Sequence, residues 1–237
     1  MATNDGPPAK RRKLDLYEEV MVLVGPSKTR ATVPKCILTR SSDFLAACCK
    51  GEWKEAKTKT IKLPEIDPDS FSIYLQWLYK SELVTVEQGC HDEAGVRDLS
   101  GDEKFRIAGK ELMALLKLAV LADKLGDLEL SNATVDALKH AMDTLDCGPG
   151  VEEIPLVYEQ LPENSPIRRM MVDNYTVIVT PKYLMDNKKL FPPDFFFDLM
   201  MNLVKNEPEG IPNSQPYPCD KCKYHQHNDK APKCSED

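Results

Sequence analysis

The sequence has no long run of apolar residues. A membrane-spanning helix needs about 18 to 20 of them in succession, and no stretch of the 237 residues comes close to that length. Residues 1–13 are polar and basic without an apolar centre, so we do not expect a secretory signal peptide. Without secretion the eight cysteines should remain mostly reduced thiols. Five are scattered and are expected to be packing residues: Cys36, Cys48, Cys49, Cys90 and Cys147.

The short patterns that mark common catalytic sites are also missing. There is no Gly-x-Ser-x-Gly, no His-Glu-x-x-His and no dinucleotide-binding glycine pattern. Gly109-Lys110 is followed by Glu and lacks the upstream glycine, which excludes a phosphate-binding loop. His91 and His140 have no carboxylate or nucleophile placed to work with them. We therefore expect that the protein is not an enzyme.

The charge pattern points away from nucleic acid and toward a local basic signal. A net charge of −7 argues against a nucleic-acid surface that spans the sequence. The basic residues Lys10, Arg11, Arg12 and Lys13 follow Pro7-Pro8 in a tail, residues 1–15, that we expect to be disordered. The cluster resembles a nuclear import signal, which an importin groove reads as an extended peptide. The alternative is a solvated charge run.

The first half of the chain alternates short strand and helix patterns. Val20–Val24 and Thr29–Val33 are separated by Gly25-Pro26 and predict a hairpin. Leu38–Lys50 has near-helical spacing, with Ser41 or Ser42 as the N-cap and Gly51 as the end. A third strand is predicted over Thr58–Leu63, and a helix from Asp67-Pro68 to Tyr79, with Phe71, Tyr74, Leu75, Leu78 and Tyr79 on one face.

The second half is predicted to be helical. Residues 86–108 are polar and without period, so we expect a loop there. The helices that follow are predicted over 112–125, stopped by Gly126, and from Asp127 to Met142. After Gly148-Pro149-Gly150, two further helices are predicted at Pro166–Val179 and Pro192–Val204.

This order of elements resembles the BTB/POZ domain, in the version common in fungi, over about residues 17–145. The residues that carry the resemblance are Val24-Gly25, Val33, Lys35, Leu38, Ser41 or Ser42, Phe44, Glu52, Glu55, Leu63-Pro64, Phe71, Trp77-Leu78-Tyr79 and, later, Leu118–Gly126 and Asn132. Ala31 and Pro34 stand where the pattern usually has Phe and His. These two departures argue against partner binding through the charged pocket of many animal members.

The resemblance implies an α/β (α+β) fold in which a helical cluster covers a small sheet, with additional C-terminal helices. It implies a protein–protein interaction module that commonly forms homodimers through helix faces and sometimes through an exchanged edge strand. Val20–Val24 is interpreted as a short apolar edge strand, which needs a partner or a cover. The alternative is a monomer whose own N-terminal segment covers that edge.

Trp53 and Glu55 stand where many BTB adaptors carry an apolar-x-Glu triplet that docks a cullin ubiquitin-ligase scaffold. A large apolar side chain can anchor in a pocket while a carboxylate adds a directed polar contact. We therefore predict a cullin adaptor that recruits an unknown protein substrate. The alternative for these residues is a Trp53 packed on its own domain with a solvated Glu55. The alternative for the protein is a nuclear scaffold or transcriptional co-regulator that binds no cullin.

The C-terminal tail concentrates cysteine and histidine. Zinc takes four such ligands in tetrahedral geometry, and the tail offers five, Cys219, Cys222, His225, His227 and Cys234. Its Cys-x-x-His-x-His ending also resembles tails of fungal BTB proteins. Structural zinc modules usually separate their ligand pairs further, so a polar tail with reduced thiols is the alternative. A third interpretation makes this tail a contact for nucleic acid.

The expected organisation has six parts: a basic tail (1–15), a BTB/POZ core (17–85), a polar loop (86–108), a helical extension (109–145), a C-terminal helical region (150–210) and a Cys/His-rich tail (211–237). The expected location is the nucleus.

Overall fold

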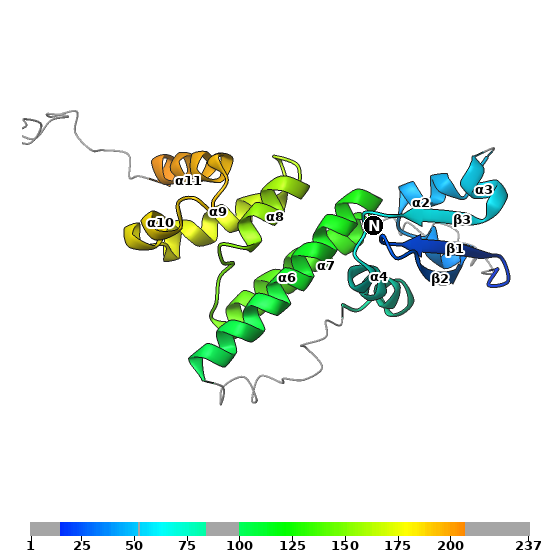
Figure 1. The fold of residues 1–237 in the computed structure, drawn as a ribbon, viewed down its shortest axis with the longest axis horizontal. Helices are drawn as coiled ribbons and strands as arrows, with labels where there is room; N and C mark the ends of the chain where they lie inside the picture. Colours follow the sequence, from blue (N-terminus) through cyan, green and yellow to red (C-terminus); the bar gives the residue numbers. More distant parts are fainter. Residues whose placement is uncertain (1–14, 52, 84–99, 207–237) are drawn as a thin grey trace, which may run out of the picture.

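The computed structural model describes residues 15–51, 53–83 and 100–206. Figure 1 shows the sheet at one end of the molecule, the long α6–α7 hairpin in the middle, and helices α8 to α11 at the other end. In chain order the elements are β1 (Glu19–Val24), β2 (Thr29–Pro34), α1 (Lys35–Leu38), α2 (Asp43–Cys48), α3 (Lys54–Thr58), β3 (Thr60–Leu63), α4 (Pro68–Lys80), α6 (Gly101–Leu125), α7 (Leu128–Leu145), α8 (Glu153–Gln160), α9 (Pro166–Ile178), α10 (Pro181–Asn187) and α11 (Pro193–Asn206).

The sheet has three strands in the order β2-β1-β3. β1 pairs antiparallel with β2, as the predicted hairpin requires, and parallel with β3. Val20, Val22 and Val24 alternate along β1 and are buried, so one face of the sheet is turned to the core.

The prediction that Val20–Val24 is an edge strand was wrong. The helices α1 to α3 form a crossover that brings β3 back beside β1, in parallel, with Val22 paired to Ile61. Both edges of β1 are therefore occupied by its own chain. The argument that this strand needs a second copy or the N-terminal segment as its cover does not hold.

The single helix predicted over Leu38–Lys50 is interrupted. Ser42 has extended backbone angles, φ −110° and ψ 113°, so the chain leaves the helix after α1 and starts again at α2. The Ser42 hydroxyl accepts the Leu45 backbone N–H at 3.1 Å, which confirms Ser42 as an N-cap. The short helices α1 and α3 were not predicted, because four or five residues are too few to show a period.

Helix α4 begins as predicted. The Asp67 carboxylate accepts the Ser70 backbone N–H at 3.0 Å, and Pro68 occupies the first helical position. Phe71, Tyr74 and Leu78 are buried, but Tyr79 is exposed. Tyr79, which was predicted on the same face, lies outside its buried part.

Helix α6 starts earlier than expected. A polar loop was predicted to run to residue 108, but α6 already begins at Gly101. Ser100 and Glu103 form a capping box at this helix start. The Ser100 backbone N–H donates to the Glu103 carboxylate at 3.2 Å, and the Glu103 N–H donates to the Ser100 hydroxyl at 3.4 Å. The Ser-x-x-Glu spacing is typical of a helix start. The polar composition of the segment led to the prediction of a loop instead.

The turn between α6 and α7 lies where it was predicted. Gly126 has a φ of +62°, which favours glycine, and the Asp127 carboxylate accepts the Leu130 N–H at 3.0 Å. Ser41 donates to the other Asp127 oxygen, and the Ser42 hydroxyl donates to the Leu125 carbonyl. These bonds hold α2, and with it the sheet end of the molecule, against this turn.

Two hydrophobic cores share helix α6. The first joins the sheet and α4 to the C-terminal part of α6, through Leu118, Leu121, Ala122 and Leu125. The second joins α8, α9 and α11 to the middle of α6, through Leu112, Leu115, Leu116, Ala119 and Val120. A 25-residue helix that belongs to both cores is the structural link between the two ends seen in Figure 1.

Helices α9 and α11 confirm the two predicted C-terminal helices, whereas α8 and α10 were not predicted. Helix α8 contains Pro155, which usually argues against a helix, but it stands in the first turn, where backbone N–H groups have no intrahelical partner. Helix α10 has only seven residues. Among the helices of the described ranges, none is both long and apolar enough to cross a membrane.

Candidate docking surface

Trp53 and Glu55 lie at the start of α3, on the connection that returns the chain from α2 to β3. Gly51, with a φ of +75°, lets the chain turn after α2. Trp53 then occupies the N-cap position of α3, and Glu55 falls in its first turn, where a carboxylate favours the helix dipole. Lys59, in left-handed conformation, ends α3 directly before β3.

The Trp53 side chain is 68% exposed. A tryptophan that contributed to its own core would be mostly buried, so the alternative that Trp53 packs on its own domain is not what the structure shows. Glu55 is half-buried rather than fully solvated. The two side chains thus lie two residues apart on one short helix, with the aromatic ring free of its own core.

Glu55 lies close enough to the end of α2 to influence the Cys48 thiol. Burial, and after it the negative charge of Glu55, raise the pKa of the Cys48 thiol. The Glu55 charge therefore acts on the Cys48 thiol, and Cys48 packs against the first core. A half-buried carboxylate has less freedom to reorient than a fully exposed one.

A second feature anchors this end of the domain. The Glu18 carboxylate accepts from Lys35 Nζ at 3.1 Å and lies 4.0 Å from Lys59 Nζ. Because Lys59 follows α3 and Glu18 precedes β1, the pair links the end of α3 to the start of the sheet. At this exposure we expect only a small contribution to stability.

Two predicted sites lie outside the described residues. These are the basic cluster, Lys10 to Lys13, and the proposed zinc ligands of the tail, Cys219, Cys222, His225, His227 and Cys234. Both stay predictions. Within the described ranges, no group of three or more His, Cys, Asp or Glu side chains could hold a metal ion.

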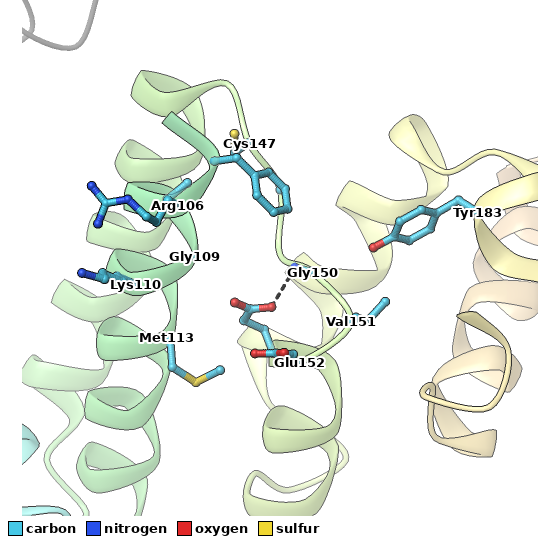
Figure 2. Close-up of a pocket in the computed structure, with 13 residues that line it drawn as sticks. Arg106, Gly109, Lys110, Met113, Cys147, Gly150, Val151, Glu152 and Tyr183 are labelled. Carbon is cyan, nitrogen blue, oxygen red and sulfur yellow. Dashed lines mark hydrogen bonds between the residues drawn. The ribbon is translucent and has the colours of Figure 1, made fainter. Parts of the chain in front are cut away.

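A hollow that was not predicted lies far from Trp53, between α6 and the α8–α10 region. Its volume is about 560 Å³, and Phe105, Met113 and Tyr183 contribute to a mainly apolar lining. Figure 2 shows Tyr183 across this hollow from the α6 residues Gly109 and Met113. It is formed by residues distant in sequence, so no local pattern could have indicated it.

Burial affects two titratable groups that line this hollow, Glu153 and Cys147. The Glu153 carboxylate accepts the Gly150 backbone N–H at 2.9 Å, the bond dashed in Figure 2, and burial raises the pKa of Glu153. Burial also raises the pKa of the Cys147 thiol, which keeps it protonated and a poor nucleophile. Neither group indicates chemistry in this hollow, so Trp53 and Glu55 remain the candidate site.

Comparison with known proteins assigns the sheet end of the molecule. Residues 10–97 match the family model of the BTB/POZ domain. This match covers β1 to α4, including Trp53 and Glu55, and confirms the BTB/POZ resemblance for this part of the chain. No curated protein matches the chain at a significant level.

Proposed function

We propose that this chain, which contains a BTB/POZ domain, is a nuclear substrate adaptor of a cullin ubiquitin ligase. A BTB/POZ domain is a protein–protein interaction module, so the open question is which protein it contacts. The observation that carries the proposal is the exposure of Trp53 beside the half-buried Glu55 at the start of α3. In this role the C-terminal helices would select the substrate.

The pair has the physical properties of an interface anchor. Burying an exposed tryptophan in a partner pocket removes a large apolar area from water, and tryptophan is enriched among residues that dominate binding energy. Glu55 can accept a hydrogen bond at the rim of that contact. The proposal also includes self-association of the BTB/POZ domain into a homodimer, because domains of this family commonly self-associate.

We expect Trp53→Ala to weaken binding of a cullin N-terminal domain at least tenfold, which corresponds to about 1.4 kcal/mol or more. Glu55→Ala should weaken it less, since a partly exposed polar contact contributes less than a buried aromatic anchor. Isothermal titration calorimetry with the full chain measures both effects. Phe105→Ala is the matched control, because Phe105 is 67% exposed and lies on α6, outside residues 10–97. Equal affinities for the Trp53 and Phe105 variants would contradict the proposed docking surface.

Nuclear location is proposed from the basic cluster at residues 10–13. Replacing Lys10, Arg11, Arg12 and Lys13 with alanine should shift the protein from the nucleus to the cytoplasm, because an importin groove reads these charges directly. Quantitative imaging of a fusion large enough to exclude passive diffusion through nuclear pores measures the shift. A nuclear fraction that does not change would refute the import signal.

A further inference from the structure

Helix α11 has large apolar side chains on two opposite faces. Phe195 and Leu199 are 0% and 3% exposed and belong to the second core. On the other side Phe197 and Val204 are 58% and 61% exposed. A helix face that carries several large apolar side chains is usually buried. The outer face of α11 is therefore a surface that the described part of the chain leaves uncovered.

Four of the exposed apolar residues form a stripe along the helix, and a fifth, Leu203 at 45% exposure, lies beside it. We call Phe197, Met200, Met201 and Val204 the α11 stripe; their exposed fractions are 58%, 51%, 37% and 61%. They follow the spacing i, i+3, i+4, i+7, which places them on one side of a helix. A contiguous apolar surface of this kind marks an interaction site more often than scattered apolar residues do.

We propose that the α11 stripe binds a second copy of this chain, with the two α11 helices antiparallel about a two-fold axis. The spacing of the stripe reads the same in both chain directions, so an antiparallel copy presents a matching pattern. Phe197 of each copy then faces Val204 of the other, and Met200 faces Met201. A surface that complements itself in this way is what a two-fold interface requires.

The charges that flank the stripe select the antiparallel arrangement. Asp194 and Lys205 are exposed and stand at opposite ends of α11. At a rotation of 100° per residue, Asp194 and Lys205 lie on the same side of the stripe. Around the helix axis Asp194 is about 20° from Met201, and Lys205 is about 40° from it. In an antiparallel two-fold pair equal flanks face each other, so each Asp194 meets the Lys205 of the other copy, offset by about 3 Å along the axis. A parallel two-fold pair would place the two charged flanks on opposite sides of the interface, so Asp194 would not meet Lys205.

This contact would be separate from self-association through the BTB/POZ domain. α11 lies outside residues 10–97 and at the end of the molecule away from the sheet, as Figure 1 shows. The proposal therefore does not depend on the cullin-adaptor function, and either could fail without the other.

The apolar part of the proposal is tested by the mass of the full chain in solution. We expect Val204→Glu to lower the average mass measured by sedimentation equilibrium about twofold, because two buried glutamates would replace two apolar contacts. Val177→Glu is the control, since Val177 is 84% exposed on α9 and not part of the stripe. An unchanged mass for Val204→Glu overturns the proposal. A wild-type chain that is already monomeric also overturns it, as does a stripe covered by residues 207–237.

The orientation is tested by exchanging the charges. Asp194→Lys should raise the dissociation constant for this step of association at least tenfold, because Lys then faces Lys205. Adding Lys205→Asp should restore it. The exchanged charges are unfavourable for the dipole of α11, so recovery cannot come from a stabilised helix. Failure of the double variant to recover overturns the antiparallel arrangement.

Discussion

Replacing Arg168 with alanine is expected to lower the free energy of unfolding by about 3–5 kcal/mol. The Arg168 side chain enters from α9 and is only 8% exposed. Its Nη2 donates to the backbone carbonyls of Tyr158 and Leu161, both at 2.6 Å. These carbonyls belong to the C-terminal end of α8, where no intrahelical N–H remains to satisfy them.

Two contacts explain why this buried cation is tolerated. Hydrogen bonds from a charged donor are stronger than neutral ones, and the Arg168 guanidinium also lies 4.5 Å from the centre of the Tyr158 ring. Alanine would remove both and leave two carbonyls without a donor in a buried site. Lysine has one ammonium group and cannot reproduce the planar arrangement, so Arg168→Lys should also destabilise, but by less.

Urea denaturation followed by far-UV circular dichroism measures this effect. Arg169→Ala is the matched control, because Arg169 is the next residue of α9 and is exposed. We expect the control to change stability by no more than about 0.5 kcal/mol. Similar losses for the two variants would show that the bonds to α8 do not stabilise the fold as argued.

Leu118→Ala is expected to cost about 2–5 kcal/mol, as for other fully buried leucines. Leu118 is 0% exposed and joins α6 to the core beneath the sheet. Leu115→Ala should cost a similar amount in the second core, where Leu115 is also 0% exposed. Because both residues belong to one continuous helix, we expect each variant to destabilise the whole chain rather than one end.

Two spectroscopic probes distinguish unfolding of the whole chain from unfolding of one end. Trp77 packs against the first core, so tryptophan fluorescence follows mainly the sheet end, whereas circular dichroism follows all helices. The two signals should give one coincident transition in the wild type and in both variants. A fluorescence transition that moves in Leu118→Ala but not in Leu115→Ala would show that the two cores unfold independently.

The parts of the fold that local chemistry decides could be predicted from the sequence. The strand alternation around Val22, the Asp67-Pro68 helix start and the Gly126-Asp127 turn each depend on a few neighbouring residues, and the structure contains all of them. The Ser100 capping box is of the same kind and could have been read. The pairing partner of β1 could not, because strand order depends on contacts between residues about 40 positions apart, such as Met21 and Thr60.

The candidate site, too, could be predicted from the sequence only in part. The identity of Trp53 and Glu55 as a pair came from their spacing and from the motifs around them, which the family match over residues 10–97 confirms as a BTB/POZ pattern. Their exposure did not follow from the sequence, since a tryptophan after a helix packs inward as readily as outward. The two apolar faces of α11 were also hidden, because the spacing of Phe195, Phe196, Leu199, Met200 and Leu203 does not distinguish a buried side from an uncovered one.

The central claim is most directly tested by the affinity of the unmodified full chain for the N-terminal domain of a cullin from the same source. Isothermal titration with protein shown to be folded by circular dichroism is the measurement. The adaptor function predicts a dissociation constant in the micromolar range or below. No detectable binding at cullin concentrations of about 100 μM, where a micromolar complex would be nearly saturated, would contradict it and favour a nuclear scaffold or co-regulator that acts through other partners.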